Sequence, residues 1–242
     1  MIAEQHLALT DTFNSPFHFP DSSPFQQPNN HPDFVGEVFL RCNAKEVVER
    51  CGKLAQKLAK EAFAPDVPVP KVEIEGHVDT TFPYILSHLE YMIGELLRNS
   101  IQATIETHHH PNSPNSSSQL PAIRVLICHA PQHIIFRVSD QGGGIPPQEL
   151  PHLWSFSKGP RSQARLESFS KVPTMAATMQ ELMNSHTHKS SATTERKSRR
   201  EESSLSSLTS RPPNLRLGMG LPMSRVYAEY WAGKLELHRS VG

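Results

Sequence analysis

Two polar residues, Glu95 and Asn99, stand at the edge of the apolar pattern in the segment EYMIGELLRNSIQAT. They are four residues apart, so in a helix both side chains lie on one face. An amide oxygen suits Mg²⁺, which keeps waters and substrate phosphates as its other ligands. A carboxylate one turn away can orient or deprotonate an attacking hydroxyl. Taken alone, such a pair is more often a set of solvated surface groups.

A second motif, DQGGGIP, places Asp140 and the glycines Gly142 to Gly144 directly after an alternating segment. Glycines lack Cβ atoms and adopt positive φ, so backbone there can come close to a ligand. An aspartate at the end of a buried strand can accept a hydrogen bond from an exocyclic amino group, which favours adenine over guanine. The alternative is a tight turn in which backbone amides satisfy Asp140.

A third motif, GMGLPMSR, places Gly218 and Gly220 at the mouth of a predicted helix. The first amides of a helix and the positive end of its dipole suit phosphate oxygens. A single GxG before a helix is weak evidence, and alone it is better explained as a helix start that needs small residues.

The elements that must position these motifs follow from the spacing of apolar residues. Residues 34–42 are predicted to form a strand, Asn43 to cap the helix that follows, and residues 71–78 to form another strand. The next helix, with Ser87 as its cap, carries Glu95 and Asn99. Two sets of residues recur at helical spacing and predict the buried faces of these helices: Val47, Cys51, Leu54, Ala55, Leu58 and Ala62; then Leu89, Met92, Ile93, Leu96, Leu97 and Ile101.

Residues 122–128 and 133–139 alternate as two strands of an antiparallel hairpin whose turn contains Pro131. Residues 161–213 read as a long polar loop, either functional or disordered. A helix opens at Gly218, and residues 234–239 are predicted to form a last strand. This order predicts a mixed sheet with helices on one face.

Composition excludes several classes of function. The 242 residues carry 24 basic and 24 acidic side chains, so no overall field favours nucleic acid or an anionic membrane. No apolar run approaches the ~18 residues that a membrane span requires. Cys42, Cys51 and Cys128 have no CxxC spacing, which favours reduced thiols.

Together the three motifs resemble the ATP-binding domain of sensor histidine kinases, gyrase-type topoisomerases, ninety-kilodalton heat-shock chaperones and MutL-type repair proteins. The resemblance implies an α+β fold, a two-layer α/β sandwich whose mixed sheet is mostly antiparallel. Longer segments are similar to the mitochondrial branched-chain 2-oxoacid dehydrogenase kinases and the related pyruvate dehydrogenase kinases: PDFVGEVFLRC, VEIEGHVDTTFPYI, ELLRNSIQATIETH, RVSDQGGGIP and GLPMSRVYAEYWAGKLEL. The turn RLGMGLPMSR looks like that of fungal members.

The resemblance assigns a role to each motif. Glu95 matches the catalytic glutamate, Asn99 the Mg²⁺ ligand and Asp140 the adenine-binding aspartate, with Gly142 and Gly144 beside it. The other nucleotide contacts fall at the start of a lid and on the phosphate-side turn: Ser157, Gly218, Gly220 and Leu221. The implied cofactors are ATP and Mg²⁺. The implied activity is that of a protein serine kinase that phosphorylates the E1α subunit of a 2-oxoacid dehydrogenase complex and inactivates it.

The resemblance also implies an organisation and partners. Residues 1–10 match the end of a helix from an N-terminal bundle missing here, 11–33 a polar loop, and 34–242 the kinase domain, with its lid in 161–213 and its last strand missing. The implied partners are E1α and the lipoyl-bearing E2 core in the mitochondrial matrix. A second copy of this chain is a further candidate partner. Two alternatives stay open: a truncated, weak or inactive ATP-binding regulatory module of the same family, and another ATPase of the same fold.

Overall fold

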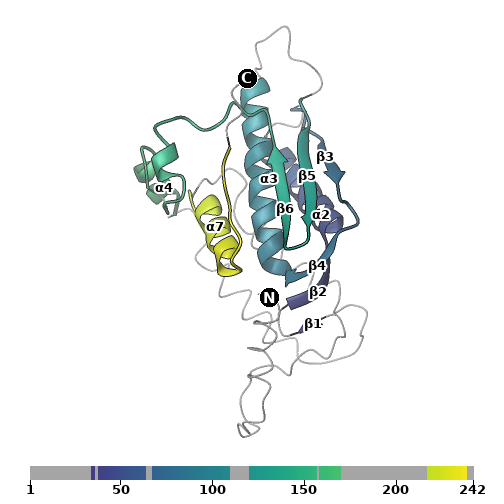
Figure 1. Cartoon of the computed structure of the whole chain (residues 1–242). Coiled ribbons are helices and arrows are strands. Elements are labelled where there is room, and N and C mark those ends of the chain that lie inside the picture. Colours follow the sequence, from purple (N-terminus) through teal and green to yellow (C-terminus); the bar gives the residue numbers. More distant parts are fainter. Residues whose placement is uncertain are drawn as a thin grey trace, which may run out of the picture.

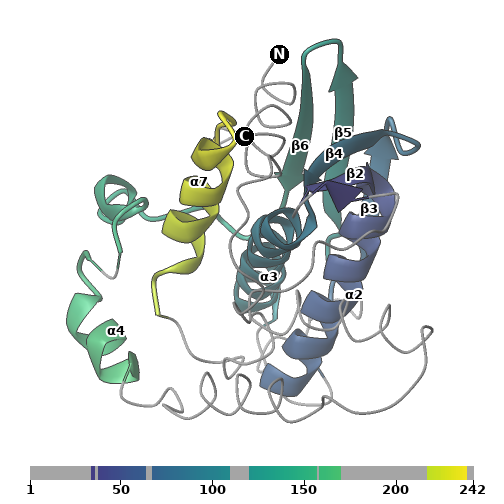
Figure 2. The same cartoon turned by 90° about the horizontal axis from the view of Figure 1, so that it is seen from below.

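The computed structural model describes residues 34–35, 38–63, 67–109, 120–156, 158–169 and 217–238. The described elements form two layers, with helices α2 (Ala44–Ala62), α3 (Leu86–His108) and α7 (Gly220–Tyr230) on one side of the strands. Seen from below in Figure 2, α3 lies between α7 and α2 and packs against both. The helix that carries Glu95 and Asn99 is therefore the centre of the helical layer.

In the part of the chain that the structure describes, six strands form two three-stranded sheets. One sheet has the order β3 (Val72–Gly76), β5 (Ile123–Ala130), β6 (His133–Ser139), and the other β1 (Phe34–Val35), β2 (Val38–Asn43), β4 (Thr81–Ile85). Among the described strands, β3 and β5 pair in parallel and the other three pairs are antiparallel. This confirms the predicted α+β class, with a mixed, mostly antiparallel arrangement and helices on one face.

Helix α2 begins where the sequence predicts. The side chain of Asn43 accepts a hydrogen bond of 3.1 Å from the backbone N–H of Glu46, which satisfies one of the amides at the helix start. The buried side chains lie on one stripe and include Val47, Cys51, Ala55 and Leu58, as the spacing predicts. Leu54 and Ala62 are only partly buried, whereas Val48, Gly52 and Ala59 are buried as well, so the buried stripe is displaced around the helix from the predicted one.

Helix α3 is buried along most of its length because α2, α7 and the strands surround it. Its buried apolar residues form the middle of the core: Leu89, Met92, Ile93, Leu97, Ile101 and Ile105. The predicted cap at Ser87 is wrong. Strand β4 runs directly into the helix, so the cap position falls on Ile85, whose side chain makes no capping bond.

Three features of the strands and loops differ from the sequence prediction. The single strand predicted over 34–42 is two strands, β1 and β2, which pair with each other so that Val35 faces Val38. Strand β4 was not predicted because Pro83 interrupts its pattern, but an edge strand can contain a proline. Inside the predicted loop at 161–213 a short helix, α4 (Ser162–Phe169), is present. The rest of that loop lies outside the described residues.

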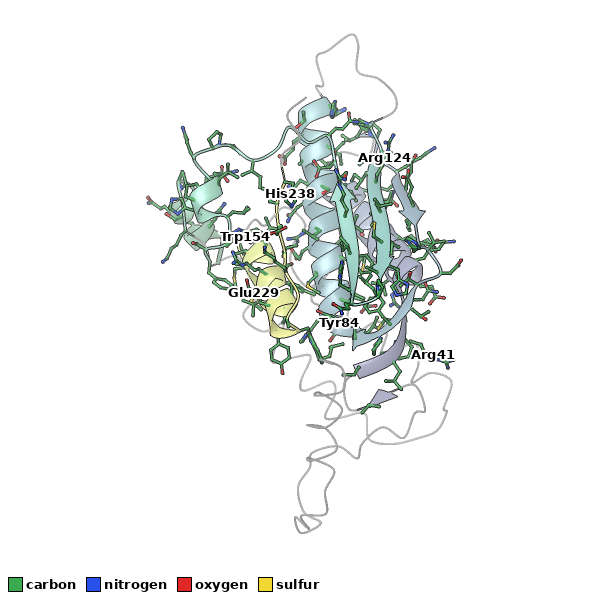
Figure 3. All side chains as sticks on the ribbon, in the orientation of Figure 1. Arg41, Tyr84, Arg124, Trp154, Glu229 and His238 are labelled. Carbon is green, nitrogen blue, oxygen red and sulfur yellow. The ribbon has the colours of Figure 1, made fainter. Side chains whose placement is uncertain are left out.

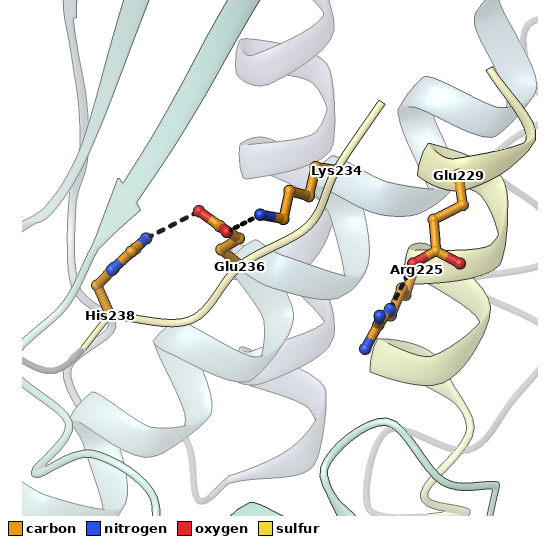
Figure 4. Close-up of polar contacts among 5 residues, drawn as sticks. All are labelled: Arg225, Glu229, Lys234, Glu236 and His238. Atoms are coloured by element: carbon orange, nitrogen blue, oxygen red, sulfur yellow. Dashed lines mark hydrogen bonds and ion pairs between the residues drawn. The ribbon is translucent and has the colours of Figure 1, made fainter. Parts of the chain in front are cut away.

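The predicted last strand over 234–239 is not formed among the described residues, although the chain there has an alternating pattern. Lys234, Glu236 and His238 lie along one side, and Glu236 contacts Lys234 at 2.5 Å and His238 at 3.3 Å (Figure 4). Leu235 packs against the core from the other side. The segment runs beside the core without forming a strand, because it is paired with none of the described strands.

The hairpin before Asp140 is confirmed. Strands β5 and β6 pair antiparallel from Arg124 and Ser139 to Ala130 and His133, with Pro131 in the two-residue turn. No helix in the described part of the chain has the length and apolar character needed to cross a bilayer.

Candidate active site

A cavity of about 580 Å³ lies between α3, the glycine loop after β6, the segment that leads into α4, and the start of α7. It brings together seven of the residues singled out in the sequence: Glu95, Asn99, Gly142, Gly144, Gly218, Gly220 and Leu221. Asp140 does not line the cavity but lies directly behind Gly142, and Ser157 lies outside the described residues. Three motifs that are distant in sequence thus meet in one place.

Glu95 is fully buried at the α3 wall of the cavity. Arg98, one turn further along the helix, donates a hydrogen bond from Nη2 to its Oε2 at 2.9 Å. The same oxygen lies against the start of α7, where a Cβ on Gly220 would come within 2.1 Å of it. The carboxylate is therefore fixed between two groups, and the interpretation as a solvated surface residue is wrong for Glu95.

Asn99 lies one turn beyond Glu95, on the same face of α3, and is partly exposed to the cavity. The helical spacing that places both residues on one face is the spacing read from the sequence. Its neighbours on that face, Gln102 and Glu106, line the same wall. This wall offers amide and carboxylate oxygens, the hard donors that a divalent cation bound to phosphates requires.

Asp140 is attached to α3 by its own carboxylate. Ser100 donates its hydroxyl to Asp140 Oδ2 at 2.8 Å, and the backbone N–H of Gly142 donates to Oδ1 at 2.9 Å. The second bond is the one that a tight-turn interpretation expects. The first is a contact between side chains forty residues apart, which fixes the carboxylate relative to the helix that carries Glu95 and Asn99.

The glycine loop is docked onto α3. Thr107 donates its hydroxyl to the carbonyl of Gly142 at 2.9 Å, and a Cβ on Gly142 would come within 2.5 Å of the Ala103 side chain. The close approach of α3 alone requires glycine at residue 142, which also lines the cavity. Gly144 has a φ of 78° and faces the cavity too.

The start of α7 forms the wall opposite the glycine loop. Gly218 has a φ of 68°, which only glycine adopts readily, and Met219 at the cap position makes no side-chain bond to the helix amides. Gly220 and Leu221 line the cavity. An uncapped helix start with two small residues fits an anionic group, as the third motif predicts.

No individual basic residue was assigned to the site from the sequence. Lys158, Arg161 and Arg165 line the cavity, and Glu149 pairs with both arginines. All three basic residues stand where the predicted lid begins. On the outer side of this segment Arg225 of α7 lies over the ring of Trp154, at 5.2 Å from its centre, and Figure 3 labels Trp154 beside α7.

Comparison with known proteins supports the same location. The family described as histidine kinase-, DNA gyrase B- and HSP90-like ATPase matches residues 85–242, which include every residue assigned to the site. The chain is 28% identical over its whole length to pyruvate dehydrogenase (acetyl-transferring) kinase 2, mitochondrial, of Saccharomyces cerevisiae, and covers 51% of that protein. It is 26% identical to kinase isozyme 3 of Mus musculus, with 88% of this chain aligned to 41% of the relative.

A third relative, the mitochondrial pyruvate dehydrogenase kinase of Schizosaccharomyces pombe, is 25% identical over 85% of this chain and 39% of its own length. The chain thus spans about half the length, or less, of the curated relatives it matches. These likenesses confirm the resemblance to the mitochondrial dehydrogenase kinases. With the family match over most of the chain and the predicted fold in place, this protein belongs to the histidine kinase-, DNA gyrase B- and HSP90-like ATPase family.

Proposed function

We propose that this chain is the ATP-binding and phosphoryl-transfer part of a protein serine kinase that acts on the E1α subunit of a mitochondrial 2-oxoacid dehydrogenase complex. The observation that carries the proposal is the meeting of Glu95, Asn99 and the Gly218–Gly220 turn around one cavity, with Asp140 fixed behind it. The likeness to kinases named for pyruvate dehydrogenase supports the choice of substrate.

The cavity fits a nucleotide polyphosphate with its metal. Gly218 and Gly220 line the cavity at the uncapped start of α7, whose first amides suit phosphate oxygens. We assign adenine to Asp140, whose carboxylate accepts a hydrogen bond from the exocyclic amino group. Asn99 would hold Mg²⁺ through its amide oxygen. When bound, Mg²⁺ neutralises charge on the phosphate oxygens.

In the proposed phosphoryl transfer, Glu95 acts as the base and the start of α7 stabilises the phosphate charge. The acceptor serine gives its hydroxyl proton to Glu95 while its oxygen forms a bond to the γ-phosphorus. The bond from the γ-phosphorus to the bridging oxygen breaks, and ADP leaves with that electron pair. Arg98 holds the Glu95 carboxylate in place, and the amides at the start of α7 stabilise the phosphate charge that develops.

The wider assignments rest on the resemblance. The proposal places the protein in the mitochondrial matrix, with E1α and the lipoyl-bearing E2 core as partners and a second copy of the chain as a candidate partner. The alternative is a nucleotide-binding regulatory module that does not transfer phosphate.

An assay of labelled γ-phosphate transfer from ATP to purified E1 distinguishes the kinase from the regulatory module. The kinase proposal predicts that the chain labels E1 and that Glu95→Gln abolishes labelling while both proteins bind Mg-ATP. The control is Glu61→Gln, a change of an exposed glutamate near the end of α2 that should leave labelling unchanged. If the parent chain binds Mg-ATP but labels nothing, the kinase proposal is wrong and the regulatory module is supported.

A further inference from the structure

The side chain of Arg165 in α4 lies across the glycine turn that opens α7. A Cβ placed on Gly218 would come within 2.8 Å of Arg165 Cδ, 3.0 Å of Nε and 3.1 Å of Cζ. Cδ, Nε and Cζ of Arg165 therefore all lie close to this turn. A side chain at residue 218 would displace the guanidinium. Glycine is therefore required there both for the positive φ of the turn and for the position of Arg165.

Arg165 is also held at its tip. Nη1 donates to the backbone carbonyl of Lys158 at 2.8 Å, and Nη2 lies 3.7 Å from Oε2 of Glu149. Glu149 is itself paired with Arg161. The side chain of Arg165 is only 21% exposed, against 51% for Arg161. Because it is already ordered, little side-chain entropy is lost when it binds a ligand.

The charges around the cavity are unevenly distributed. The wall formed by the segment before α4 and by α4 carries three basic groups, Lys158, Arg161 and Arg165, against one carboxylate, Glu149. The α3 wall carries two carboxylates, Glu95 and Glu106, against Arg98. An anionic ligand is therefore attracted to the side where Arg165 and the start of α7 face the same space.

We propose that Arg165 is a phosphate-binding residue of the nucleotide site and that it recognises the phosphates beyond the α-phosphate. A guanidinium presents a planar fork of N–H donors that matches two phosphate oxygens, and Nε of Arg165 lies next to Gly218, at the start of α7. Arg165 thereby makes the site select a polyphosphate over a monophosphate. This inference rests on the proposed nucleotide-binding function of the cavity.

The experiment is calorimetric titration of the purified chain with Mg-ATP and, separately, with AMP. Arg165→Ala is expected to weaken Mg-ATP binding by about tenfold to a hundredfold, the loss typical of a charge-assisted hydrogen bond, and to leave AMP binding unchanged. Arg165→Lys keeps the charge but loses the fork, so its Mg-ATP affinity should fall between those of the parent and the alanine variant. The lysine variant also keeps the test valid if the alanine variant does not fold.

A matched control is Arg124→Ala. Arg124 lies on β5, away from α7 in Figure 3, pairs with Glu73 and does not line the cavity, so neither affinity should change. Equal Mg-ATP affinity in the parent and the Arg165 variants overturns the inference. An equal loss for Mg-ATP and AMP also overturns it, because Arg165 would then support the fold of the site and not bind phosphate. In both cases the parent still binds Mg-ATP, and the proposed function stands. If the parent binds no nucleotide, the proposed function and this inference fail together.

Discussion

The carboxylate of Glu95 occupies the place where a side chain on Gly220 would begin. Oε2 of Glu95 lies 2.1 Å from the position of a Cβ on residue 220, much closer than a non-bonded carbon and oxygen can approach. Glycine at 220 is therefore a condition for Glu95 and the start of α7 to lie together. The motif that contains Glu95 and the motif that contains Gly220 are far apart in the sequence, and this contact joins them in a single site.

Gly220→Ala tests that relationship. Alanine is the better helix former, so the local effect of the change favours folding. The clash with Glu95 is expected to outweigh it, destabilise the protein by about 1–3 kcal/mol in urea unfolding, and lower the affinity for Mg-ATP. Gly52→Ala in α2 is the control, because its new Cβ would meet Val72 at 3.6 Å, an ordinary contact. A Gly220→Ala variant as stable and as avid as the parent would show that Glu95 does not depend on this glycine.

Ser100→Ala tests how Asp140 is positioned. The change removes the 2.8 Å hydrogen bond to Oδ2 but leaves the carboxylate and its bond to the Gly142 amide. We expect Mg-ATP binding to weaken by roughly fivefold, about 1 kcal/mol, measured by calorimetry. The control is Ser87→Ala, an exposed serine in the first turn of the same helix that makes no capping bond. No change in Ser100→Ala would mean that the Gly142 amide alone positions Asp140.

Arg50→Met tests the ion pair that joins α2 to α3. Arg50 pairs with Glu90, which is fully buried, so removing the arginine leaves a carboxylate charge inside the helical layer. The free energy of unfolding should fall by about 3 kcal/mol. Lys57→Met removes an exposed pair with Glu61 on the same helix and should change stability by less than about 0.5 kcal/mol. Similar effects of the two changes would contradict a structural role for the buried pair.

The buried thiols predict both a reactivity and a pH dependence. Burial raises the pKa of Cys42 and of Cys51 from 9.0 to about 12. The folded protein keeps both protons more tightly than the unfolded chain does. Their contribution to stability is therefore fully present below pH 9 and is lost as the pH rises from 9 towards 12.

Alkylation at neutral pH followed by mass spectrometry checks the reactivity. The partly exposed Cys128 should react in the folded protein, and Cys42 and Cys51 only after unfolding in urea. Urea unfolding at pH 8 and pH 10 checks the pH dependence, with a lower stability expected at pH 10. Rapid modification of Cys51 in the folded chain would contradict its place in the core.

The sequence predicted what local chemistry controls. Asn43 caps α2 because an amide side chain can reach the amide three residues on, and Glu95 and Asn99 share a face because of the helical period. It did not predict what depends on distant partners. Ser87 fails as a cap because β4 continues into α3, and residues 234–238 are extended without being a strand because no paired neighbour is present.

The site, too, contains features set by local sequence and features set by contacts between distant residues. A side chain at residue 142 would meet Ala103 on α3, and this could not be read from the sequence because only the folded chain brings the two residues together. Arg165 was read as loop because nothing in its own neighbourhood indicates that it lies over Gly218. The periodicity of the sequence cannot predict which residues face each other across the cavity, because their spacing in the chain carries no information about their distance in space.

Calorimetric titration of the purified chain with Mg-ATP, beside Asp140→Ala, tests the central claim that this cavity binds an adenine nucleotide. Asp79→Ala, a change of an exposed aspartate that does not line the cavity, is the control. We expect binding by the parent and the control, and loss of binding in Asp140→Ala without loss of the fold. Equal binding by all three proteins would contradict the role of Asp140, and absence of binding by a folded parent chain would contradict the nucleotide site itself.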